Sequence, residues 1–186
     1  MGEPQPIEAM SAAEYLDWEP AQVEKYEFSH GEIFAMGGAS RRHVTVSGNV
    51  FFELAQALAE TPCRVYMADM KLEVEPDRAY FYPDVLVTCD PDDHRSDQFM
   101  RRPTLLVEVL SASTAAFDRG DKATIYRRIP SLKEFVLIDP DRQRIELYRR
   151  QEDGAWELRD IDPDQPLPLT SLGTEIPWPR IFRNAD

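Results

Sequence analysis

The sequence has no long apolar run, only two cysteines, and fewer basic than acidic residues. Apolar runs such as FVLI, Phe135 to Ile138, are far too short to span a bilayer. The N-terminal stretch MGEPQPIEAM is acidic and lacks the apolar core of a secretory signal. These absences exclude a membrane-spanning chain, and we expect a cytoplasmic protein with no membrane partner.

The two cysteines, Cys63 and Cys89, form neither a CxxC motif nor the multi-cysteine framework of a small disulfide-rich domain. We therefore predict two reduced thiols, in keeping with a cytoplasmic location.

The net charge of −13 argues against broad nonspecific binding to nucleic acid. The charge is unevenly distributed, because the stretch from Arg95 to Arg128 holds seven basic and four acidic residues, a net charge of +3. A solvated charged surface and a local anion site both explain this imbalance.

The order of predicted elements indicates an α/β or mixed α+β fold, with one central sheet flanked by helices. A length of 186 residues favours a single domain, residues 1–186, with irregular, extended ends at 1–10 and 161–186. Capping residues, hydrophobic periodicity and turn residues predict the elements between these ends. They are a helix at 11–18, a hairpin at 26–36, a helix at 43–59, strands at 64–74, 80–90 and 103–111, a helix from about 118 to 130, a strand at 133–140 and a hairpin at 141–161.

Two carboxylates interrupt otherwise apolar strands. Glu108 lies in the middle of LLVEVLSAST and shares a strand face with Leu106 and Leu110. Asp84 begins the preceding apolar run. Carboxylates are rarely buried without a partner, and two at one site repel each other unless a cation is present. A divalent metal such as Mg²⁺, or Mn²⁺, would supply that cation. A structural ion pair of Glu108 with Lys122 or an arginine is the main alternative, and Asp84 alone could cap a turn.

Lys122 lies near the start of the helix that follows the Glu108 strand. A lysine and a helix N-terminus both favour an anion such as a phosphate. Two acids, a metal and a lysine together suit phosphodiester hydrolysis. A surface lysine in an amphipathic helix is the other interpretation.

At these residues the sequence resembles the Uma2 family, within the PD-(D/E)XK nuclease superfamily. The resemblance covers roughly Tyr26 to Pro140, and the motifs follow the order of the family. They are YEFSHGEIFAM, RRHVTVSGNVFFEL, YPDVLV, LLVEVLSAST and DRGDKATIYRRIPSLKEFVLID.

The resemblance implies a restriction-endonuclease-like core with a mixed central sheet. It also implies that Asp84 is the aspartate of the PD motif and Glu108 the second acid, with both holding Mg²⁺ alongside the carbonyl of Val109. The superfamily lysine two residues after that acid is absent, because position 110 is Leu. Lys122 is the expected substitute.

Six further residues are candidates for supporting roles, each with an ordinary structural alternative. Glu32 is a possible further acid or a solvated hairpin residue, and Asp69 a site residue or half of an exposed pair. His43 matches a histidine of the family pattern but could be a polar or capping group. Ser111 could orient Glu108 or cap a helix. Asp118 and Tyr126 lie one helical turn from Lys122, and packing is the alternative role for Tyr126.

The sequence thus predicts a Mg²⁺-dependent endonuclease that hydrolyses DNA, with Asp84, Glu108 and Lys122 as catalytic residues. The alternative is a catalytically inactive nuclease-like module that binds nucleic acid or protein. A homodimer is expected by analogy with the superfamily.

Overall fold

The computed structural model describes residues 10–111 and 115–186. Residues 1–9 of the irregular end predicted at 1–10 therefore lie outside the described residues. Its largest element is a six-stranded mixed sheet in which β8 and β9 are parallel and the other neighbours are antiparallel. In spatial order its strands are β11 (Trp156–Ile161), β10 (Arg144–Arg150), β9 (Glu134–Asp139), β8 (Pro103–Val109), β6 (Val85–Thr88) and β3 (Arg64–Met67).

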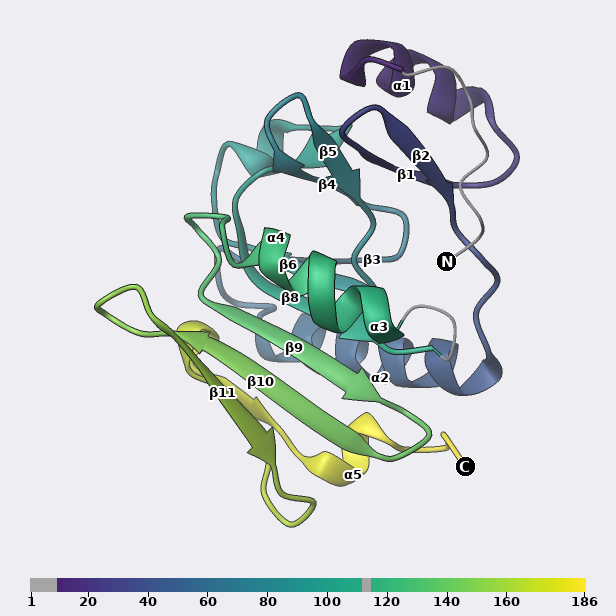
Figure 1. The fold of residues 1–186 in the computed structure, drawn as a ribbon. Helices are drawn as coiled ribbons and strands as arrows, with labels where there is room; N and C mark the ends of the chain where they lie inside the picture. The colour runs from purple at the N-terminus through teal and green to yellow at the C-terminus, as the bar shows by residue number, and fades with distance from the viewer. Residues whose placement is uncertain (1–9, 112–114) are drawn as a thin grey trace.

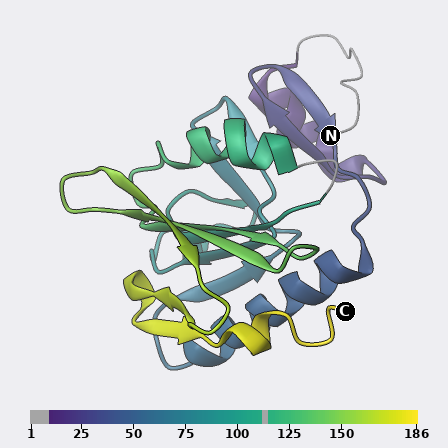
Figure 2. The same ribbon diagram turned by 60° about the horizontal axis from the view of Figure 1, so that its bottom comes forward.

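Helices cover both faces of this sheet, as the sequence predicts (Figure 1, Figure 2). On one face α2 (Arg41–Ala57) lies beside the C-terminal segment. On the other lie α3 (Ala115–Phe117), a π-helical turn (Asp118–Lys122) and α4 (Ala123–Tyr126). The strand periodicity decides which side chains meet each layer, since Val107 of β8 packs toward α2 whereas Leu106 packs toward α4.

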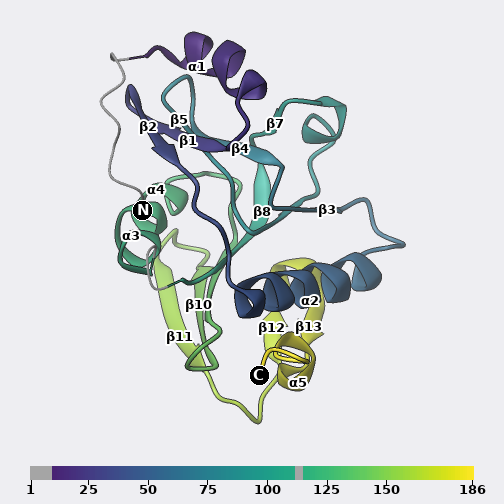
Figure 3. The same ribbon diagram turned by 90° about the vertical axis from the view of Figure 1, so that its right-hand side faces the viewer.

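A second sheet lies beyond one end of the first, with α1 (Ala12–Trp18) and the 3₁₀ turn Glu19–Ala21 packed near it (Figure 3). A capping box of Ser11 and Glu14 starts α1, the helix predicted at 11–18. In spatial order the strands of this sheet are β2 (Glu32–Ala35), β1 (Tyr26–Ser29), β5 (Ala79–Phe81), β4 (Lys71–Glu75) and β7 (Phe99–Met100).

Two predicted strands are each divided between the two sheets. The strand predicted at 64–74 is broken at Ala68, whose φ of +48° lies in the left-handed region. The strand predicted at 80–90 is broken at Pro83, which has no N–H for a ladder hydrogen bond. The breaks face each other, because the Ala68 amide donates to the Asp84 carbonyl at 3.1 Å. Asp84 therefore sits where the chain crosses from the small sheet to the large one.

The prediction of an irregular stretch at 161–186 is wrong. This segment forms the hairpin β12 (Leu167–Leu169) and β13 (Thr174–Ile176), a 3₁₀ turn (Thr170–Leu172) and the short helix α5 (Trp178–Ile181). Its prolines occupy positions that tolerate them, such as the N-terminal turn of α5. Buried Leu167 and Trp178 join the core, and the carboxylate of Glu134 accepts hydrogen bonds from Ser171.

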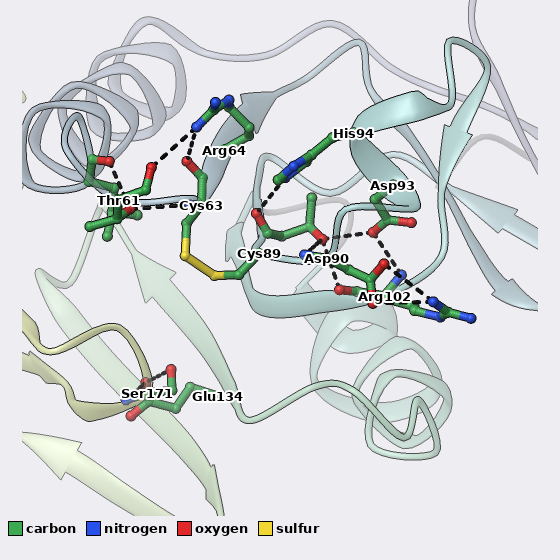
Figure 4. The surroundings of a disulfide bond; sticks show 12 residues. Thr61, Cys63, Arg64, Cys89, Asp90, Asp93, His94, Arg102, Glu134 and Ser171 are labelled. Carbon is green, nitrogen blue, oxygen red and sulfur yellow. Dashed lines mark hydrogen bonds and ion pairs between the residues drawn. A yellow bond between two sulfur atoms is a disulfide. The ribbon is translucent and has the colours of Figure 1, made fainter.

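The prediction of two reduced thiols is also wrong, because Cys63 and Cys89 form a disulfide (Figure 4). Strands β3 and β6 pair with Arg64 opposite Thr88, so the next positions outward are the two cysteines. This pairing depends on strand register, which the spacing of the cysteines in the sequence did not reveal. Within the described residues, no helix is both long and apolar enough to cross a lipid bilayer.

Candidate functional site

Glu108 is a buried carboxylate on the face of β8 that packs toward the α3–α4 helical segment. Only 3% of the residue is exposed. The Tyr126 hydroxyl donates to its Oε1 at 2.7 Å, and the Lys122 Nζ lies 3.2 Å from the same atom. Burial raises the pKa of Glu108, and the charge of Lys122 opposes this rise. The same helix thus supplies both partners of this carboxylate.

Asp84 immediately precedes β6, the strand that pairs with the Glu108 strand β8. Strands β6 and β8 pair with Val85 opposite Val107, so the next position brings Asp84 opposite Glu108. Both residues line one pocket, and the backbone amide of Val109 donates to the Asp84 Oδ2 at 2.7 Å. The two carboxylates that the sequence singled out thus line the same pocket.

His43, in the first turn of α2, approaches Asp84 from the helical layer. Its Nε2 lies 3.2 Å from the Asp84 Oδ2. Although burial lowers the pKa of His43, the hydrogen bond and charge of Asp84 raise it above its ordinary value overall. Its Nδ1 is buried without a hydrogen-bond partner in the described part of the chain. His43 therefore holds Asp84 in place, beyond the polar or capping role that its position alone suggested.

Lys122 is a buried lysine, 6% exposed, and not a surface residue of an amphipathic helix. It is the last residue of the π-helical turn, which widens the helix locally. Such turns are frequent at functional sites. Its Nζ lies 2.9 Å from the Glu27 Oε1 and 3.8 Å from the Asp118 Oδ1. Although burial lowers the pKa of Lys122, the surrounding carboxylates, Glu108 first among them, raise it overall. Lys122 is therefore held in its charged form.

Glu27 is the member of the site that the sequence analysis missed. It lies in β1, is buried, and accepts a second hydrogen bond from the Tyr82 amide at 3.0 Å. The signal was available, because Glu27 stands between the aromatic residues Tyr26 and Phe28 in a short strand. Like Glu108, Glu27 is a carboxylate among apolar strand residues, and such a group is rarely buried without a partner.

The other candidates divide between the site and the surface. Ser111 and Asp118 line the same pocket, and Tyr126 is bonded to Glu108 below it. Glu32 is exposed on β2, and Asp69 is an exposed partner of Lys25. For these two residues the ordinary alternatives, a solvated hairpin residue and an exposed pair, are the ones observed. On this hairpin the acid that reaches the site is Glu27.

The pocket above these residues has a volume of about 700 Å³. Acidic groups and Lys122 form its floor. Its walls come from the β1–β2 hairpin, the glycine-containing loop that follows it, the start of α2, and the helical segment after β8. The site therefore lies where the two sheets meet.

The donor set fits a hard divalent cation. The carboxylates of Asp118, Asp84 and Glu27 all act electrostatically on buried Glu108. Among the described residues, the Lys122 ammonium contacts Glu27, Glu108 and Asp118, and no contact with Asp84 is seen. Mg²⁺ is commonly held by one or two carboxylates and waters, which is what Asp84 and Glu108 offer. No cluster of three or more metal-binding side chains occurs among residues 10–111 and 115–186, so any such ion would keep a largely aqueous shell.

The chain is similar to a protein family and to individual known proteins. The model of a family called Uma2, described as "Putative restriction endonuclease", matches residues 12–178. Two proteins of Synechocystis sp., slr1290 and sll1609, both described as uncharacterized, are similar in sequence. The first is 38% identical over 96% of this chain and 94% of its own length, the second 36% over 82% and 87%.

A crystal structure from Anabaena variabilis, described as a putative nuclease belonging to DUF820, has the same fold. The TM-score is 0.79, and the match covers 95% of this chain and 99% of that one at 18% identity. The expected restriction-endonuclease-like fold is thereby confirmed.

Proposed function

This chain belongs to the Uma2 family, and from that membership we propose that it is a Mg²⁺-dependent endonuclease that hydrolyses DNA phosphodiester bonds. The observation that carries the proposal is the placement of Asp84, just before β6, and Glu108, in the neighbouring strand β8, in one pocket with Lys122 beside Glu108. Mn²⁺ would serve the same donors.

Asp84, Glu108 and the carbonyl of Val109 are the groups that would hold the metal. When bound, the ion would polarise the phosphate and lower the pKa of an attacking water. Asp84 is oriented by His43 and by the Val109 amide, and Glu108 by Tyr126. The two carboxylates are therefore fixed before any ligand arrives, which limits the reorganisation needed for catalysis.

Lys122 would stabilise the negative charge that develops on the phosphate. An ammonium has three N–H donors, and Glu27 and Glu108 lie within hydrogen-bond distance of two of them. Since Lys122 also lines the pocket, the third donor is directed to a phosphate oxygen in our proposal. Lys122 thereby replaces the lysine that Leu110 displaces from the superfamily motif.

Asp84→Asn and Glu108→Gln should each reduce the rate of DNA cleavage on the order of a thousandfold, because metal polarisation contributes several kcal/mol. The test is cleavage of supercoiled plasmid and of single-stranded oligonucleotide with Mg²⁺, Mn²⁺ or EDTA. Glu32→Gln is the matched control, since this acid is exposed on the same hairpin as Glu27. Wild-type rates in both site variants would refute the assignment.

A wild-type protein that is folded but cuts neither substrate with any divalent metal would overturn the proposed activity. Salt-dependent DNA binding without cleavage would then favour the alternative, a nuclease-like binding module.

Glu27→Gln should lower kcat by roughly 10- to 100-fold, because Lys122 loses the charged partner that positions it. The KM for DNA should change little, since Glu27 contacts Lys122 and the Tyr82 amide. Steady-state kinetics would separate the two parameters, and Glu27→Asp should restore part of kcat. A variant with normal kcat would show that Glu27 has only a structural role.

A further inference from the structure

The catalytic groups of the proposed site are recessed. Glu108 is 3% exposed and Lys122 is 6% exposed, and both are reached through the pocket of about 700 Å³. A phosphodiester must therefore enter the pocket to meet them. A backbone stiffened by pairing and stacking in a double helix cannot bend a phosphate and its sugar inward without deformation, which costs free energy.

The pocket walls carry more apolar side chains than contact with a phosphate or a sugar would need. Phe34 and Met36 line one side, Met67 and Phe117 line others, and all four are only partly buried. Val44, at the start of α2, is 57% exposed and also lines the pocket. Such side chains suit the flat faces of nucleobases, on which aromatic groups stack in single-strand binding proteins. In a duplex those faces are already covered by neighbouring bases.

The charge around the pocket is poorly suited to duplex binding, which depends on many lysine and arginine contacts with phosphates. Five acids and two lysines line the pocket, and one of those lysines, Lys25, is paired with Asp69. Five of the six arginines in the basic stretch are paired with carboxylates, as with Arg101 and Glu73 or Arg119 and Glu146. The sixth, Arg127, donates to the Ala123 carbonyl. The solvated, ion-paired surface is thus the better of the two explanations of that stretch.

From these three observations we infer that the pocket takes an unpaired DNA strand, with a base against the apolar wall and its phosphate at the acidic floor. This inference rests on the proposed nuclease activity and specifies its substrate. Stacking supplies most of the binding in this arrangement, and phosphate contacts supply less.

The test compares Mg²⁺-dependent cleavage of one oligonucleotide sequence as a single strand, as a blunt duplex, and as a duplex with a single-stranded extension. The single strand and the extension should be cut at least about tenfold faster than the duplex. Phe34→Ala should raise the KM for the single strand by about tenfold. Phe52→Ala is the matched control, because Phe52 is 49% exposed on α2 and does not line the pocket.

Duplex cut as fast as the single strand, or a Phe34→Ala variant with normal KM, would overturn this inference and leave the nuclease activity standing. Binding provides the second readout, measured by fluorescence anisotropy with the Asp84→Asn variant in Ca²⁺. Tighter binding of the single strand, with a weak dependence on salt, would support the inference even if nothing is cleaved. Equal or tighter binding of the duplex would refute it.

Discussion

Lys122→Met should abolish DNA cleavage and also lower the free energy of unfolding by roughly 3 to 5 kcal/mol, the usual cost of removing one partner of a buried ion pair. The side chains have similar length, so little packing is lost. What is lost is the only ammonium seen beside the carboxylates of Glu27, Glu108 and Asp118 in the described residues. Those carboxylates would remain buried with too little positive charge.

Urea denaturation of the two proteins measures this difference. Lys133→Met is the matched control, because Lys133 is exposed, and its effect should stay within about 0.5 kcal/mol. Adding Glu108→Gln to Lys122→Met should recover part of the lost stability, since it removes one uncompensated charge. A single variant as stable as the wild type would contradict a tightly coupled site.

The pairing of Glu108 with Lys122 unites the two interpretations that the sequence left open. A structural ion pair and a metal-binding acid were alternatives for Glu108, yet the geometry is compatible with both roles at once. Glu108 contacts Lys122 and Tyr126 and still lines the pocket opposite Asp84. An ammonium and a divalent cation can share one carboxylate, which has two oxygens.

Hydrophobic periodicity identified the elements that lie entirely within one layer. Helix α2 and strands β8 and β9 were predicted because each carries one unbroken pattern. The same method failed for 64–74 and 80–90. Alternation continues through Ala68 and a largely apolar run continues across Pro83, although the backbone changes sheets at both places. Periodicity reports which side chains are buried, and it does not report which sheet buries them.

The candidate site was predictable where its residues interrupt a pattern and unpredictable where only register brings groups together. Glu108 stood out as an acid among leucines and valines. Glu27 gave a weaker signal, because its four-residue strand places only Tyr26 and Phe28 directly beside it. That Asp84 and Glu108 lie close together was a hypothesis from the sequence. Only the register of β6 and β8 gives it structural support.

Reduction of the Cys63–Cys89 disulfide, or Cys63→Ser, should lower the free energy of unfolding by roughly 3 kcal/mol. The bond closes a loop with a sequence separation of 26 residues, and loop-closure entropy in the unfolded chain sets this magnitude. For a domain of this size the midpoint of thermal unfolding should fall by roughly 6 to 12 °C. Scanning calorimetry with and without a reductant measures the shift, and the Cys63→Ser variant should not respond to the reductant.

The cleavage rate well below the unfolding temperature should be unchanged by the same reduction. The disulfide joins the end of β6 that follows Thr88, whereas Asp84 precedes the first residue of that strand. The ladder between β3 and β6 and the bond from the Val109 amide to Asp84 persist without it. A rate that falls along with stability would mean that the loop between the cysteines, which carries Asp84, depends on the covalent link for its position. An unchanged rate would show that the pairing of β6 with β8 is sufficient to hold Asp84 opposite Glu108.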